Sequence, residues 1–232
     1  MANFNFPTQP QKQNNGGNVF PSDLLQGDRQ YYTSISFSDY SANPGALLGG
    51  GSGYNFSFGG QFKLPLPKRI VDNNSQIWSE YDASTMGSSL LQMAQIGGAA
   101  GGGTSYLSPL VFMTYKRPTY KEHELQWTLS ASNKTESNNL KKMIKEFKAS
   151  AAPKLALMGA AYKYPKICQV TFNPKDYLFA VKPCAVITVS ADYTAAGGPS
   201  FYKSGAPTVV GLTLRLREIQ LWTEDQIRMM DP

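Results

Sequence analysis

The stretch that decides the fold covers residues 122–129 and reads EHELQWTL. Its larger side chains alternate with polar ones, and successive side chains of a strand point to opposite faces. The pattern therefore predicts a strand with one buried and one exposed face. The expected core positions are Leu125, Trp127 and Leu129, which lie on the same face of the strand as His123. The polar positions are Glu122, Glu124, Gln126 and Thr128.

A second alternation, over residues 208–219, predicts a long strand of the same kind. Leu212, Leu214 and Leu216 fall on one face of this strand. Arg215 and Arg217 fall on the other face. The leucines are therefore expected in the core, and the arginines either pair with carboxylates or meet a neighbouring subunit.

Shorter runs rich in β-branched and aromatic residues predict further strands. They cover residues 31–37, 54–58, 110–115, 167–172, 177–181 and 184–193. In the last run, strict alternation would place Val186 on the face of Thr188 and Ser190, opposite Ile187. Residues 61–67 contain two prolines, which cannot donate to a ladder, so this piece is expected at a sheet edge or across a surface.

One helix is expected among these strands, over residues 133–148. Asn133 and Glu136 have the spacing of a capping box. Apolar side chains recur at helical spacing and are expected in the core, whereas lysines occupy the other side. These apolar residues are Leu140, Met143, Ile144 and Phe147. The order of elements predicts a mainly β (α+β) fold, an antiparallel β-sandwich or half-barrel with the helix over an open flank.

Length and composition suggest one large domain with an extended arm. The chain has 232 residues, a net charge of +6 and only 16% charged residues. The polar residues 1–19 are expected to be a flexible arm, and residues 20–232 a single domain. Within that domain, residues 20–106 hold N-terminal strands and glycine-rich loops, and residues 107–232 form the core module. No stretch approaches the roughly 20 apolar residues of a membrane helix, and no secretory signal is evident at the start.

The residues that carry chemistry are sparse, and no catalytic, cofactor or metal site is expected. Cys168 and Cys184 lie in predicted strands and are interpreted as buried thiols. His123 is the only histidine, which leaves little scope for a catalytic triad. A second helix is expected at residues 83–96. The glycine run 97–103 that follows lacks the lysine of a phosphate-binding loop and is interpreted as a linker.

Several segments, taken in order, resemble the tail-tube initiator proteins of the baseplate in T-even-type, contractile-tailed bacteriophages. In the first half they are Phe20-Pro21, the strand from Tyr31, and residues 64–72 (LPLPKRIVD) leading to Trp78. In the second half they are Arg117-Pro118, residues 124–129 (ELQWTL), Glu136-Ser137, residues 144–148 (IKEFK), Tyr164-Pro165, residues 198–202 (GPSFY) and residues 205–207 (GAP).

The resemblance implies a tail-tube-like fold and a hexameric ring at the junction of baseplate hub and tail tube. Such a ring starts tube polymerisation in the virion and forms part of the channel for genome ejection. Its implied neighbours are a second junction ring or the tube subunit above, and hub or wedge proteins below. DNA or a tape-measure protein passes transiently through the lumen. Which junction layer the chain would form stays open.

The geometry of such a ring can be worked from strand spacing. If each of six subunits adds about four strands, spacing of about 4.8 Å and tilt of about 40° give a backbone diameter near 45 Å. We expect the polar face of residues 122–128 to line the lumen, because fixed cations there would hold DNA. The residues expected at contacts between subunits or rings are Arg117, Phe201, Tyr202, Arg215 and Arg217.

Two other functions remain open from the sequence. One is an ordinary tail-tube subunit or a tube protein of a secretion system. The other, from a different class, is a basic nucleic-acid-binding module, because the net charge is positive.

Overall fold

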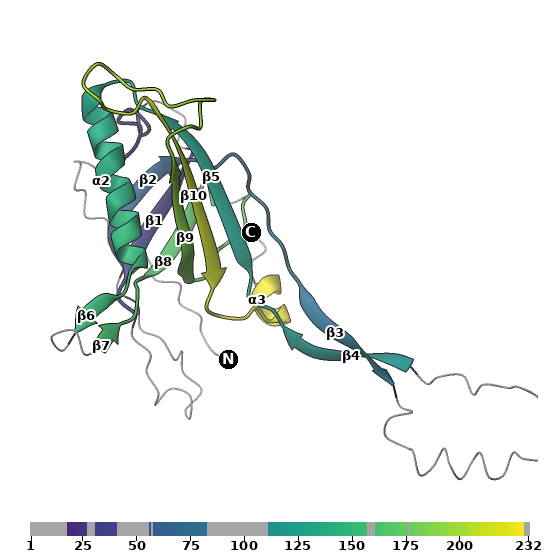
Figure 1. Ribbon diagram of the computed structural model, residues 1–232. Helices are drawn as coiled ribbons and strands as arrows, with labels where there is room; N and C mark the ends of the chain where they lie inside the picture. Colours follow the sequence, from purple (N-terminus) through teal and green to yellow (C-terminus); the bar gives the residue numbers. More distant parts are fainter. Residues whose placement is uncertain are drawn as a thin grey trace, which may run out of the picture. The chain divides into compact units, whose positions relative to one another are not determined.

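The computed structural model describes residues 18–26, 31–40, 56, 58–82, 111–156, 161–175 and 177–229 (Figure 1). The chain divides into two compact units, where the sequence suggested one domain from residue 20 onward. The larger unit joins Met1–Asn73 to Tyr120–Pro232, and the smaller unit is Asn74–Thr119. Several expectations lie outside the described residues. They are most of the arm 1–19, most of the strand at 54–58, the helix at 83–96 and the glycine run 97–103.

The larger unit is built on a six-stranded sheet with the order β2-β1-β8-β9-β10-β5. All of its strand pairs are antiparallel. The strands are β1 (Tyr32–Ser38), β2 (Gly59–Pro65), β5 (Glu122–Ser130), β8 (Ile167–Asn173), β9 (Cys184–Asp192) and β10 (Val209–Glu218). The expected mainly β, antiparallel architecture is therefore confirmed, and the proline-bearing β2 lies at an edge as predicted.

Helix α2 (Lys134–Ala151) covers the buried face of this sheet (Figure 1). It begins where expected, because the side chain of Asn133 accepts a hydrogen bond of 2.9 Å from the backbone N–H of Glu136. The Glu136 carboxylate accepts from the backbone N–H of Ser132 at 2.8 Å and from that of Ser22 at 3.1 Å. These hydrogen bonds tie the start of α2 to the segment before β1.

The ladder between β8 and β9 is the shortest in the sheet. It pairs only Ile167 with Ala185 and Cys168 with Cys184. The sheet therefore consists of two three-stranded halves, β2-β1-β8 and β9-β10-β5, joined at this short ladder. On the free edge of β5, the backbone N–H of Lys68 donates to the carbonyl of Gln126 at 2.8 Å. The chain after β2 thus partly covers that edge.

The core contains every side chain that the alternation and the helical spacing predicted for it, each at most 4% exposed. Phe147 of α2 meets the rings of Phe37 and Phe62, with centroids 5.7 and 5.0 Å away. The confirmed core positions are Leu125, Trp127, Leu129, Leu140, Met143, Ile144, Phe147, Leu212, Leu214 and Leu216. Helix and both halves of the sheet therefore share one hydrophobic core.

Two strand predictions need correction. Residues 177–181 form no strand, because a side-chain hydrogen bond from Gln169 of β8 to the Val181 carbonyl takes the place of a backbone ladder there. In β9, the pairing with β10 shifts between Arg215 and Leu216. Val186 consequently pairs with Leu216 and packs against the core, whereas Ile187 is 60% exposed. A β-bulge explains this break in the alternation.

Four elements were not expected from the sequence. The short strands β6 (Lys154–Ala156) and β7 (Ala161–Lys163) form a small hairpin after α2. Helix α3 (Glu224–Arg228) follows β10. Strand β3 (Gln76–Asp82) belongs to the smaller unit, where it pairs with β4 (Val111–Pro118).

The smaller unit is an antiparallel hairpin with exposed aromatic side chains. Trp78 and Tyr115 are about half exposed and pack edge-on, with centroids 5.4 Å apart. The Tyr115 hydroxyl donates to the side chain of Gln76 at 3.0 Å. A two-stranded hairpin is marginally stable in water by itself, and the contact between these two rings adds apolar packing across its strands.

Candidate functional site

The exposed face of β5, β10 and β9 carries polar side chains in cross-strand rows. Glu124, Arg215 and Thr188 lie side by side in one row. Gln126, Thr213 and Ser190 make the next row, and all four polar residues expected on this face of β5 are exposed. The prediction that β5 has one polar and one buried face is confirmed.

The arginines on this face pair with carboxylates of the same subunit. Arg215 lies 3.7 Å from Glu124, and Arg217 lies 3.7 Å from Glu122. The charges of these four residues sum to zero, and both arginines are already paired, so they attract an anion only weakly. Exposed pairs of this kind contribute about 0–1 kcal/mol to stability, so their main effect is on surface charge.

Of the residues expected at subunit contacts, Phe201 has the most accessible ring, at 55% exposed. Tyr202 beside it is engaged internally, because its hydroxyl donates to the carbonyl of Ala131. Arg117 is exposed on β4, where it pairs in register with Ile77.

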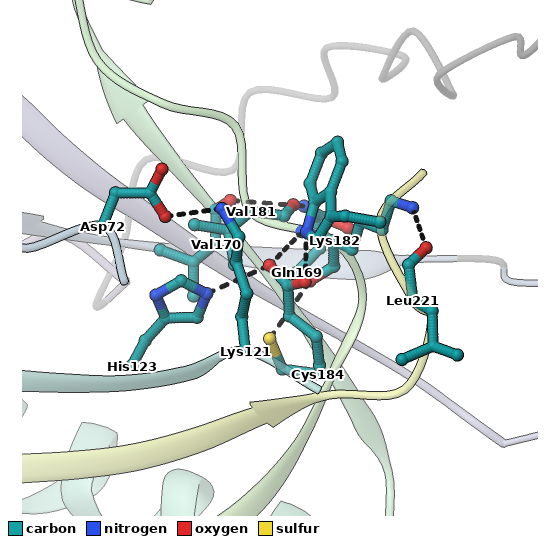
Figure 2. A network of polar contacts seen from close by, with 11 residues as sticks. Asp72, Lys121, His123, Gln169, Val170, Val181, Lys182, Cys184 and Leu221 are labelled. Carbon is teal, nitrogen blue, oxygen red and sulfur yellow. Dashed lines mark hydrogen bonds and ion pairs between the residues drawn. The ribbon is translucent and has the colours of Figure 1, made fainter. Parts of the chain in front are cut away.

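A network of buried polar groups lies where β5 begins and β10 ends (Figure 2). Its centre is Glu218, whose side chain is fully buried. The carboxylate accepts hydrogen bonds from His123 Nε2 at 3.0 Å, from the backbone N–H of Lys182 at 3.2 Å and from the indole N–H of Trp222. The other ring nitrogen of His123 has no partner, and its ring stacks on Phe179 at 5.7 Å.

Two lysines lie on the indole of Trp222 and complete the network. Lys182 Nζ is 4.1 Å from the ring centroid and donates to the Leu221 carbonyl and the Gln226 side chain, both at 2.6 Å. Lys121 Nζ is 5.3 Å from the same ring and bonds to Asp72 at 2.6 Å. Burial lowers the pKa of Lys182, Glu218 raises it and Lys121 lowers it again.

The network holds the C-terminal segment in place. Trp222 is 8% exposed, and Gln226 ties helix α3 to Lys182. A histidine beside a carboxylate could exchange protons, but both side chains are at most 3% exposed and bonded to protein groups. The arrangement therefore fixes the segment after β10 rather than presenting a group to a substrate.

The two cysteines face each other across the short β8–β9 ladder, and both thiols are free and buried. A hydrogen bond with Cys168 and burial raise the pKa of the Cys184 thiol well above its ordinary value. A raised pKa disfavours the reactive thiolate. The interpretation of two buried thiols is confirmed.

Within the described ranges, no three histidine, cysteine or acidic side chains gather so as to hold a metal ion. No helix in the same ranges has the length and apolar character needed to cross a membrane.

The sequence matches no protein-family model and no curated protein. The features that bear on function are therefore the polar strand face, the buried network and the exposed aromatic surfaces.

Sequence reasoning missed the buried network, although the alternation contained its signal. The buried positions run from Lys121, just before β5, through His123 to Leu125. On β10 the buried row of leucines ends in Glu218. Charged residues at core positions of two adjacent strands indicate a buried polar cluster, because an isolated buried charge is too costly. Lys182 and Trp222 come from connecting segments that show no such pattern.

Proposed function

We propose that this chain is a structural subunit of a contractile phage tail. It forms a hexameric ring between the baseplate hub and the tail tube, starts tube polymerisation and lines part of the DNA channel. The order of segments that resemble tail-tube initiator proteins supports this proposal, together with the mainly β fold.

The observation that carries the proposal is the charge-balanced exposed face of β5 and β10. A DNA channel must let phosphates pass without holding them, and each unpaired cation adds affinity. Glu122 and Glu124 pair with Arg217 and Arg215, so this face combines polarity with zero charge from these four residues. The face therefore has the properties of a channel lining.

Exposed aromatic and apolar side chains supply surfaces for neighbouring subunits and rings. Trp78, Met113 and Tyr115 are 50–58% exposed on the β3–β4 hairpin. Leu155 and Tyr162 are 67% and 70% exposed on the β6–β7 hairpin. Burial of such side chains contributes about 1.5–3 kcal/mol each, so a few of them stabilise an assembly.

Imaging tests the assembly directly. The purified chain is examined by negative-stain electron microscopy, alone and mixed with the tube subunit of the same particle. Six-fold rings that seed tubes of fixed bore are expected. A species that remains monomeric with and without the tube subunit would reject the ring.

Charge reversal tests the lining. Replacing Glu122 and Glu124 with lysine changes the charge of the four residues from zero to +4 per subunit. DNA passage through the assembled tail should slow, and the slowing should weaken at higher salt. Unchanged ejection by variant particles with normal rings would mean that another face lines the lumen.

A further inference from the structure

An apolar groove lies between α2 and the loop that joins β9 to β10. Its volume is about 350 Å³, near the lower end of the roughly 300–1,000 Å³ typical of ligand pockets. Leu140 and Ile144 of α2 face Phe201, Pro207 and Val210 across it. Leu140, Ile144 and Val210 are at most 4% exposed and form the floor of the groove, whereas the ring of Phe201 is 55% exposed at its side. The groove therefore has room for one or two apolar side chains and not for a large ligand.

Hydrogen bonds hold the groove open before anything binds. The Ser137 hydroxyl donates to the Pro207 carbonyl at 2.8 Å, which ties the loop to α2. Tyr202 donates to the Ala131 carbonyl through its hydroxyl, and its backbone N–H donates to Ala206 at 2.8 Å. A preformed groove lowers the ordering cost of binding.

A row of lysines runs along one rim of the groove. Lys134, Lys141, Lys145 and Lys148 recur at spacings of seven, four and three residues, which places them on one stripe of the helix. All four are exposed, and within the described part of the chain none of them has an ion-pair partner. Lys142 is a neighbour of Lys145 at a spacing of three residues, but it lies about 160° around the helix from Leu140 and Ile144, which line the groove, so it points away from the groove.

Helix α3 has the complementary properties. It has no buried residues, and its first turn carries Glu224 and Asp225. Glu224 is paired with Arg228 of the same helix at 2.7 Å, and such exposed pairs contribute only about 0–1 kcal/mol, so this carboxylate can exchange partners. Ile227 is 42% exposed and Met229 just beyond it is 80% exposed. Trp222 and the bond from Lys182 to Gln226 fix the helix at the end of β10, so its acidic and apolar side chains are held outward.

We propose that α3 of one copy docks into the α2 groove of a second copy. Ile227 and Met229 enter the apolar groove, while Glu224 and Asp225 face the lysine stripe. The helix cannot reach the groove of its own subunit. The groove lies at Val210 and α3 follows Glu218, so the two sites are separated by roughly 25 Å of strand.

This contact is heterologous, because different surfaces of the two copies meet. Heterologous contacts produce rings when the rotation closes and filaments when it does not. The inference rests on the proposed self-association and names the surfaces that would make it. It assigns the buried network a purpose, which is to hold α3 in a fixed orientation.

Self-association of the full chain measures the docking itself. Sedimentation velocity is recorded over a range of chain concentrations. Reversible association is expected, with the Kd raised at least tenfold for Lys141→Glu/Lys145→Glu. The control Lys142→Glu should stay within about twofold of the wild type. A chain that carries Glu224→Lys/Asp225→Lys together with Lys141→Glu/Lys145→Glu should regain association.

Three results would overturn the inference. One is the absence of concentration-dependent association of the wild-type chain. Another is equal weakening by Lys142→Glu and by the stripe variant. The third is failure of Glu224→Lys/Asp225→Lys to restore association of the charge-reversed chain, which would indicate that the lysines act through another surface. Circular dichroism of every variant establishes that the fold is retained.

Imaging separates this inference from the proposed function. Normal rings of Lys141→Glu/Lys145→Glu would overturn the docking and leave the ring in place. Association of the wild-type chain that depends on Lys141 and Lys145 but yields no rings would support the docking and remove the ring. Loss of rings in this variant, restored by adding Glu224→Lys/Asp225→Lys in the same chain, would support both.

Discussion

Replacing Glu218 tests whether the buried network holds the larger unit together. The carboxylate accepts hydrogen bonds from His123, Trp222 and the backbone of Lys182, and its side chain is fully buried. Glu218→Leu keeps a similar volume but removes every acceptor. The three donors would then be buried without partners, because the surrounding core excludes water.

The expected cost follows from these contacts. Each unsatisfied buried donor costs about 1–3 kcal/mol, so three of them cost about 3–9 kcal/mol in total. Unfolding free energies of domains are about 5–15 kcal/mol, so Glu218→Leu removes a large part of the stability. Glu218→Gln retains one acceptor oxygen, and we expect it to cost about half as much.

Urea unfolding followed by circular dichroism gives the free energies. Glu124→Gln is the matched control, because it removes an exposed carboxylate whose partner is 3.7 Å away. Its expected effect is below about 1 kcal/mol. Hydrogen exchange should show that residues 219–229 lose protection in Glu218→Leu. A Glu218→Leu chain within about 0.5 kcal/mol of the wild type would refute the reasoning.

Three further predictions concern the thiols, a loop and a buried amine. Cys168 and Cys184 are both fully buried, so a thiol reagent such as DTNB should modify neither in the native chain and both after unfolding; rapid native labelling would contradict their burial. Gly205 has φ of 77°, so Gly205→Ala should destabilise by about 1–2 kcal/mol in thermal unfolding. Gly198→Ala in the same loop should be neutral, since its Cβ meets no atom within 4 Å, and equal effects would count against the argument. Burial lowers the pKa of Lys182 below its ordinary value of 10.5, so the unfolded chain holds this proton more tightly. Stability should therefore rise with pH between the lowered pKa and 10.5, and Lys182→Met should lack this rise in urea titrations at several pH values.

Strands β5 and β10 and helix α2 were predictable because their signals are local. Alternation in β5 and β10 follows directly from the pleat, and the helical spacing from Leu140 to Phe147 follows from the turn of the helix. Asn133 marks the start of α2 because its side chain accepts a hydrogen bond from the backbone N–H of Glu136, three residues later. Such patterns depend on neighbours in the sequence and can be read without knowledge of the fold.

The bulge in β9 and the buried network were not predictable in the same way. The position of Val186 depends on its register with Leu216, which lies on another strand. Glu218 gathers His123 and Lys182 from distant points of the chain. Tertiary packing decides whether a charged residue at a core position finds partners. The alternation in β10 therefore indicates that Glu218 is buried, but it does not predict which residues bond to it.

The placement of charge argues that the strand face and the helix face have different tasks. On the strand face, Glu122 and Glu124 cancel Arg217 and Arg215. On α2, the exposed lysines outnumber the one exposed carboxylate, Glu146, and α2 packs on the opposite face of the sheet. A nucleic-acid-binding module gains affinity from unpaired cations, so its DNA would bind along α2 and not along the strands. In the proposed ring, the lysines of α2 instead meet the acidic turn of a second copy.

Reversing charge at Glu122 and Glu124 should therefore alter DNA passage and spare assembly. Reversal at Lys141 and Lys145 should impair assembly without creating a DNA-binding face. DNA binding by the free subunit that disappears with the lysines would favour the nucleic-acid module over the ring.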